Sequence, residues 1–181
     1  MSQSLVELAR NGDRDAFEAL AGRAIDRLYA TASLILHDRT LAEDAVQETL
    51  IRAWRSLPRL RDADRFDGWL RQVLVHACMD AARGEKHRRT EHELPLDIPD
   101  GTDVAAASAD RDAISRAFAT LSAEHRAAFV LRHHDGYPVA QVAHALGIPL
   151  GTAKSRIHYA EQAMARAMDA DARWAPEGGM A

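Results

Sequence analysis

Apolar residues recur three or four positions apart along most of the chain, which is the spacing of one face of a helix. Between residues 13 and 36 the recurring positions are Phe17, Leu20, Ala24, Leu28 and Ala32. The Asn11-Gly12 pair interrupts the pattern just before this stretch. A short helix over residues 5–9 is therefore predicted to precede the long one.

A second helix is predicted after the polar stretch "HDRT". Thr40 with Glu43 three residues later forms a capping-box signature, and Pro58 is predicted to end the helix. The stretch "LRDADRFDG" is predicted to be a polar loop. A third helix follows and ends near Gly84, with its inward positions at Trp69, Leu70, Val73, Leu74, Ala77 and Ala81.

Residues 93–112 break the helical pattern. Two prolines, a glycine and several small residues argue against a packed element, and six Asp or Glu stand there against one Arg. The chain is therefore predicted to be all-α with two small helical domains. The first covers residues 1–92, a flexible acidic linker covers 93–112, the second domain covers 113–172 and a tail covers 173–181.

The second domain contains two short helices joined by a tight turn. Ser122 can cap one helix, Gly136 can end it, and Pro138 can begin the next, over residues 139–146. The stretch "LGIPLGTAKSRIHYAEQAM" then supplies a turn and a final helix from about Thr152 to Met168. Two short helices joined by a glycine-containing turn are typical of a helix-turn-helix.

The final helix carries the side chains of a nucleic-acid reader. Gly147 supplies the turn, and Thr152 can cap the helix, whose N-terminus favours a phosphate. Ile157 and Ala160 are predicted to face inward. The predicted groove-facing residues are Lys154, Ser155, Arg156, His158 and Tyr159. An ordinary helical hairpin with solvated Lys and Arg explains the same pattern, and the motif alone does not separate the two.

Charge is distributed unevenly. The chain has a formal net charge of −4, yet residues 139–168 contain three Lys or Arg against one Glu. Nucleic-acid binding depends on the local face, so a basic helix can function in an acidic protein. A single cysteine, Cys78, and the absence of a signal core or a long apolar run predict a cytoplasmic protein without membrane insertion.

Three stretches together resemble a known family. "GYPVAQVAHALGIPLGTAKSRIHYAEQAM" resembles region four of bacterial extracytoplasmic-function (ECF) sigma factors. "LAEDAVQETLIRAWRSL" resembles their region-two helix, and "FDGWLRQVLVHACMDAARGEKHRR" resembles the promoter-reading segment that follows. The resemblance implies a subunit that binds core RNA polymerase, directs it to promoter DNA and is controlled by an anti-sigma factor.

The resemblance also assigns roles to residues. Binding to core polymerase is implied for Asp44, Gln47, Glu48 and Trp54, although Trp54 suits the hydrophobic core equally well. Melting and reading of the minus-ten element are implied for Arg59, Arg61, Arg65, Phe66, Trp69, Arg83, Lys86, Arg88 and Arg89. Residues 51–92 contain ten Lys or Arg against six Asp or Glu. Region four would read the minus-thirty-five element through the groove-facing residues named above and Thr152.

Some positions depart from the family's usual residues. Ala153 stands where Val is common, Tyr159 where Arg is common, Gln141 where Glu is common and His76 where Asn is usual. The promoter sequence therefore cannot be copied from relatives.

Two other functions explain parts of the sequence. A regulatory helix-turn-helix protein with a sensing domain explains the second domain, but such a domain has no need of the 44–54 signature. A metal-dependent enzyme would use some of the nine histidines, but His133-His134 and His87 with His92 lack a familiar ligand spacing. The sequence therefore predicts a protein that is not an enzyme and has no metal or other cofactor.

Overall fold

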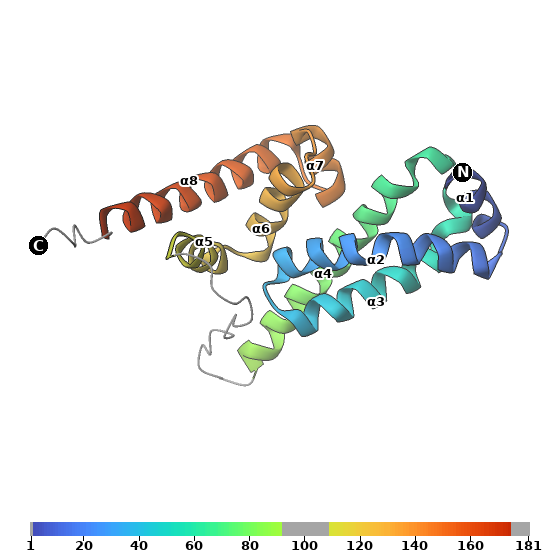
Figure 1. Cartoon of the computed structure of the whole chain (residues 1–181), viewed down its shortest axis with the longest axis horizontal. Helices are drawn as coiled ribbons and strands as arrows, with labels where there is room; N and C mark the ends of the chain where they lie inside the picture. Colours follow the sequence, from blue (N-terminus) through green and yellow to red (C-terminus); the bar gives the residue numbers. More distant parts are fainter. Residues whose placement is uncertain (1, 92–108, 175–181) are drawn as a thin grey trace, which may run out of the picture. The chain divides into compact units, whose positions relative to one another are not determined.

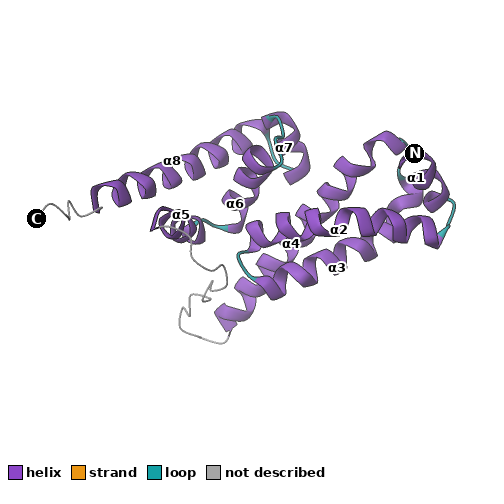
Figure 2. Ribbon diagram, in the orientation of Figure 1, coloured by secondary structure: helices purple, strands orange, loops and turns teal. Residues whose placement is uncertain are grey.

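A computed structural model describes residues 2–91 and 109–174, with side chains described for 5–88 and 115–166. Within these residues every regular element is helical (Figure 2). The chain divides into two compact units, Met1–Pro99 and Asp100–Ala181. None of the described helices is both long and apolar enough to cross a membrane. The predicted all-α fold with two helical domains is confirmed.

The first unit is a helical bundle in which α4 packs against both α2 and α3, and α1 packs on α2. Figure 1 shows α2 and α3 side by side. The elements are α1 (Ser2–Arg10), α2 (Arg14–Leu36), α3 (Arg39–Ser56), two short 3₁₀ turns, η1 (Leu57–Arg59) and η2 (Ala63–Arg65), and α4 (Phe66–Glu91).

Large aliphatic and small residues share the core of this unit. Ile35, Leu57, Leu70 and Leu74 are almost completely buried. Buried alanines, Ala32, Ala42, Ala45 and Ala53, occupy positions where helices approach one another. Because alanine adds little volume beyond the backbone, the three long helices can pack closely around the larger side chains.

The predicted start of the second helix, α3, is wrong. The N-cap of α3 is Asp38, whose Oδ1 accepts a 2.8 Å hydrogen bond from the Leu41 N–H, so Thr40 lies inside the helix. His37, at φ 53°, ends α2 and turns the chain so that Asp38 is extended. Pro58 does end α3, as predicted, within η1.

Helix α4 is longer than predicted at both ends. It begins at Phe66, inside the predicted loop, and passes Gly84 to end at Glu91. An added Cβ at Gly84 would meet nothing within 4 Å, which places this glycine on an open helix face. A glycine there costs only about 1 kcal/mol relative to alanine, and the neighbouring Glu85–Arg88 ion pair favours the helix.

The second unit consists of α5 (Ala109–Thr120), α6 (Ala123–Phe129), a π turn η3 (Val130–His134), α7 (Val139–Leu146) and α8 (Leu150–Trp174). Helix α8 packs against α5, α6 and α7 (Figure 1). The core of this unit includes the buried residues Leu131, Val142, Ala153, Ile157 and Ala160. Residues 93–108 of the predicted linker lie outside the described residues. The last four residues of the predicted linker, 109–112, belong to helix α5. The first two residues of the predicted tail, 173 and 174, belong to α8, and the rest of the tail lies outside the described residues.

Candidate functional site

The turn between α7 and α8 has the geometry of a helix-turn-helix. Gly147 lies at φ 63° and ψ 34°, a left-handed conformation that a side chain disfavours, as the sequence predicted. The Ile148 N–H donates a 3.0 Å hydrogen bond to the Ala143 carbonyl, which closes the end of α7. Helix α8 begins only three residues after Gly147.

The predicted cap of α8 is wrong. The helix begins at Leu150, and the Pro149 carbonyl accepts a 3.0 Å hydrogen bond from the Ala153 N–H. Thr152 therefore lies within the first turn, where its carbonyl accepts a 3.0 Å bond from Ser155 Oγ. A proline before the helix fixes the entry of the chain without a side-chain cap.

Helix α8 exposes part of the predicted groove-facing set. Lys154, Ser155 and His158 are exposed, and His158 Nε2 lies 2.9 Å from the Gln162 amide nitrogen. Ile157 and Ala160 are buried at 5% and 0% exposure, so their predicted inward orientation is confirmed. Lys154 and Ser155 each lie about one turn before His158, so the three exposed side chains form one polar strip along the helix.

Two other members of the set contact α6: Arg156, which is half-buried, and Tyr159, which is also exposed. The Tyr159 ring lies 4.5 Å from the His125 ring, centroid to centroid, with 38° between their planes. The half-buried Arg156 interacts electrostatically with Glu124 and His125. Burial lowers the pKa of His125 first, and the Arg156 charge lowers that pKa further. A hydrogen bond from Ser122 is the main reason that the pKa of Glu124 is lowered.

Helix α3 carries an exposed stripe that joins acidic and apolar side chains. Asp44, Gln47, Ile51 and Trp54 lie along it at helical spacing, with Ile51 at 46% and Trp54 at 37% exposure. Trp54 also contacts Phe17 of α2 at 5.1 Å, so one side of it packs and the other meets solvent. Sequence reasoning missed Ile51, although its position four residues after Gln47 places it on this face.

Glu48, the remaining predicted polymerase contact, belongs to an ion network between α3 and α4. Glu48 Oε1 and Asp80 Oδ2 each accept a 2.7 Å bond from Arg52, and Asp80 also pairs with Arg83. The bond to Asp80 is the main reason that the pKa of Arg52 is raised. The bond from Arg52 likewise lowers the pKa of Asp80. Arg52 and Asp80 were missed because their pairing depends on the packing of two helices.

The predicted minus-ten cations fall into two groups. Arg59, Arg61 and Arg65 are exposed on the segment that joins α3 to α4, and Arg65 pairs with Asp62. The other group, Arg83, Lys86 and Arg88, is exposed toward the end of α4. Arg89 continues this row in sequence, but its side chain lies outside the described ones.

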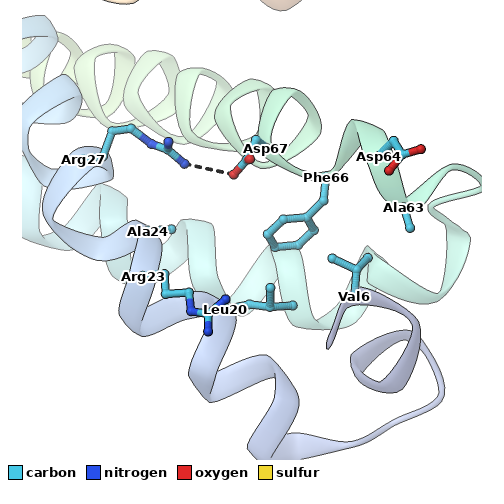
Figure 3. A pocket seen from close by; sticks show the side chains of 9 residues that line it. All are labelled: Val6, Leu20, Arg23, Ala24, Arg27, Ala63, Asp64, Phe66 and Asp67. Carbon is cyan, nitrogen blue, oxygen red and sulfur yellow. Dashed lines mark hydrogen bonds and ion pairs between the residues drawn. The ribbon is translucent and has the colours of Figure 1, made fainter. Parts of the chain in front are cut away.

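The two predicted aromatic residues of this segment lie at the start of α4. Phe66 and Trp69 contact each other with ring centroids 5.9 Å apart; Phe66 is buried at 6% exposure and Trp69 is half-buried. Phe66 faces a pocket of about 280 Å³ (Figure 3). Arg23 and Arg27 of α2 also line the pocket, and Arg27 pairs with Asp67 at 2.9 Å. Nothing in the local sequence around these two arginines pointed to this pocket.

Among the described residues, no three His, Cys, Asp or Glu side chains are placed to hold a metal ion. His133 Nε2 lies 2.9 Å from Glu161 Oε1, and His134 Nδ1 lies 2.9 Å from Asp135 Oδ1. These contacts give the His133-His134 pair structural partners in α8 and in the following turn.

Comparison with known proteins assigns the two units. Residues 20–88 match Sigma-70 region 2, and residues 111–164 match Sigma-70 region 4. The ECF RNA polymerase sigma factor SigL of Mycobacterium tuberculosis is 36% identical over 166 residues, which cover 87% of this chain and 94% of SigL. The chain belongs to the ECF sigma factor family. This confirms the resemblance that the sequence suggested.

Another relative agrees with this assignment, and two solved structures share the fold. CarQ, an RNA polymerase sigma factor of Myxococcus xanthus, is 30% identical over 159 residues, covering 84% of this sigma factor and 89% of CarQ. The structure of RpoE with the anti-sigma factor NepR from Bartonella quintana matches the fold with a TM-score of 0.71 at 23% identity, covering 86% of this chain and 98% of RpoE. CnrH, solved with the cytosolic domain of CnrY, matches with a TM-score of 0.64 at 24% identity, covering 94% and 98%.

Family membership defines the general role. The protein is a sigma factor for transcription initiation by RNA polymerase, and the family consists of transcription regulators that are not enzymes. The region 4 match includes α7, the turn after it and α8 as far as residue 164.

Proposed function

We propose that the exposed stripe of α3 is the surface that docks on core RNA polymerase. Asp44 and Gln47 offer polar and negative groups, while Ile51 and the outer face of Trp54 offer apolar area. A docking surface of this type gains affinity from buried apolar and aromatic contacts and gains association rate from charge. The observation that carries the proposal is this acidic and apolar stripe within the region 2 match.

The segment from η1 to the end of α4 is proposed to open and hold the minus-ten element. Arg59, Arg61 and Arg65 suit the backbone of an unstacked strand, and Arg83, Lys86, Arg88 and Arg89 suit neighbouring phosphates. Phe66 and Trp69 would form the apolar side of this surface. Arg23 and Arg27 extend the positive charge around the pocket that Phe66 lines.

Helix α8 is proposed to enter the major groove of the minus-thirty-five element. Lys154, Ser155 and His158 are exposed on one strip, and Thr152, Arg156 and Tyr159 flank it. Hydroxyl, amine and imidazole groups can contact base edges and phosphates in that groove.

The proposed function also suggests how the protein is regulated and where it acts. Control by an anti-sigma factor that covers the polymerase-binding stripe is proposed, since RpoE was solved with the anti-sigma factor NepR. The protein would act in the cytoplasm, where polymerase and promoter DNA meet. It would perform no catalysis and need no cofactor, because polymerase supplies the chemistry.

Run-off transcription with purified protein, core RNA polymerase and fragmented genomic template tests the proposal. Discrete start sites that require the protein are expected, and their upstream DNA would define both promoter elements. Absence of core binding and of transcripts, with a folded sample, would contradict it and favour a dimeric repressor that binds a palindrome.

An Asp44→Arg variant tests the stripe in the same assay. Reversal of this exposed charge is expected to slow association with core polymerase several-fold and lower transcript yield, while the helix content stays unchanged. Glu7→Arg, a reversal at another exposed position, on α1, is the matched control and should transcribe like the wild type. Equal effects of both variants would exclude a specific role for Asp44.

A further inference from the structure

We propose that His125 is a positioning residue that holds Tyr159 in place for base-specific reading of the minus-thirty-five duplex. The proposal rests on the role given above to α8. Tyr159 is also a position at which this chain departs from the residue common in ECF sigma factors.

The ring of His125 is itself held in place. Ser122 is the N-cap of α6, and its Oγ lies 2.8 Å from His125 Nδ1. The same Oγ accepts a longer bond, 3.5 Å, from the His125 N–H. A cap residue that contacts both the backbone and the ring of His125 restricts the rotamers of that ring.

The held ring covers one face of Tyr159. The two ring centroids are 4.5 Å apart and the planes are inclined by 38°. Tyr159 nevertheless remains 51% exposed, so much of its surface is open to a ligand. An exposed tyrosine on a helix ordinarily samples several rotamers, and ordering it on binding costs free energy. Contact with His125 restricts the rotamers of Tyr159 before DNA binds, so less free energy is lost when the complex forms.

The contact lies at the edge of the proposed reading strip. Tyr159 follows Ser155 by four residues, so both project from one side of α8. Arg156, three residues before Tyr159, is attracted to Glu124 across the same α6–α8 contact and disfavours a charged His125. A tyrosine held there can offer its hydroxyl to a base edge and its ring to a thymine methyl group.

A promoter library randomised over the minus-thirty-five element, transcribed by reconstituted holoenzyme, tests the inference. His125→Ala should reduce discrimination at one or two base positions by roughly threefold to tenfold, the range that one aromatic pair contributes. His125→Phe keeps a ring against Tyr159 and should retain most of the preference. His134→Ala, which removes an exposed imidazole elsewhere in the unit, should leave the profile unchanged.

A double-mutant cycle adds the decisive comparison. Tyr159→Ala should flatten the same positions, and adding His125→Ala to it should change nothing more, since the two residues act as a pair. An unchanged profile for His125→Ala would overturn the inference. So would a loss that is equal for all sequences, because it would indicate a phosphate contact or a purely structural role.

The wild-type reaction separates this inference from the proposed function. If wild-type holoenzyme selects no minus-thirty-five sequence at all, the proposed role of α8 fails. If it selects a sequence and the two His125 variants behave alike, only the positioning role fails.

Discussion

At the scale of single residues, Cys78 illustrates how burial controls chemistry. Its side chain is fully buried in α4, and this burial raises the pKa of the thiol to about 12. Because the thiolate is the reactive form, the native protein should react with an aromatic disulfide reagent only at the rate at which it unfolds. Absorbance measured with and without denaturant would check this, and rapid reaction of native protein would contradict it.

The pKa of His125 predicts how the stability of the second unit changes with pH. Its pKa is lowered from 6.5, first by burial and then by the Arg156 charge, so the unfolded chain binds the proton more tightly than the folded chain. The second unit should therefore lose stability as the pH falls below about 6.5 toward the folded-state pKa of His125.

The pH effect can be measured by following the His125 ring proton by NMR and by melting the protein at several pH values. A titration midpoint below 6.5 is expected, with a stability loss on acidification that is smaller in His125→Phe. A midpoint at or above 6.5 would show that the imidazolium is not disfavoured by its surroundings.

At the scale of elements, the Glu48–Arg52–Asp80–Arg83 network joins α3 to α4. Arg52 and Asp80 side chains are 37% and 43% exposed, so solvent screens their attraction. Replacing Arg52 by Met should lower the free energy of unfolding of the first unit by about 1 kcal/mol, near the upper end for partly exposed pairs. Asp80→Asn should have a similar effect, and the double variant should cost less than the sum.

Urea denaturation followed by tryptophan fluorescence would measure this effect. In a Trp174→Phe background the signal comes from Trp54 and Trp69, which both lie in the first unit. Arg14→Ala, which removes a more exposed ion pair with Glu18, is the control and should cost less than about 0.5 kcal/mol. Strict additivity of the Arg52 and Asp80 variants would argue against a coupled network.

The sequence predicted most elements because their apolar periodicity is long and regular. It also located Gly147, since a tight turn between two short helices needs a left-handed residue there. It misplaced the caps of α3 and α8, because Asp38 and Thr40 are both good caps and a proline can begin a helix without one. Which candidate is used depends on the path of the chain before the helix.

The sequence pattern does not predict which side chains of different helices contact one another. The sequence grouped Arg156 and Tyr159 with Lys154 because all three lie close together on α8. The packing of α6 against α8 then turns the first two toward Glu124 and His125. Periodicity along one helix indicates which residues face inward, but it does not say which neighbour they meet.

At the scale of the whole molecule, charge limits what the protein does alone. The net charge is −4, and the stretch from 139 to 168 has a local charge of only about +2. Affinity for duplex DNA depends on the number of phosphates that cations neutralise, since each releases counterions. Few such contacts are available from α8, so the free protein should bind a minus-thirty-five duplex weakly and with little sequence preference.

Fluorescence anisotropy with labelled duplex at several salt concentrations would test this directly. A dissociation constant of about 10 µM or weaker at physiological salt is expected, within the range of non-specific binding, with a slope of log K against log salt near −2 to −3. Adding core polymerase should give salt-resistant, promoter-specific complexes, because polymerase then supplies most of the phosphate contacts and holds α8 at the DNA. Tight, sequence-specific binding by the free protein would show instead that α8 reads its site unaided.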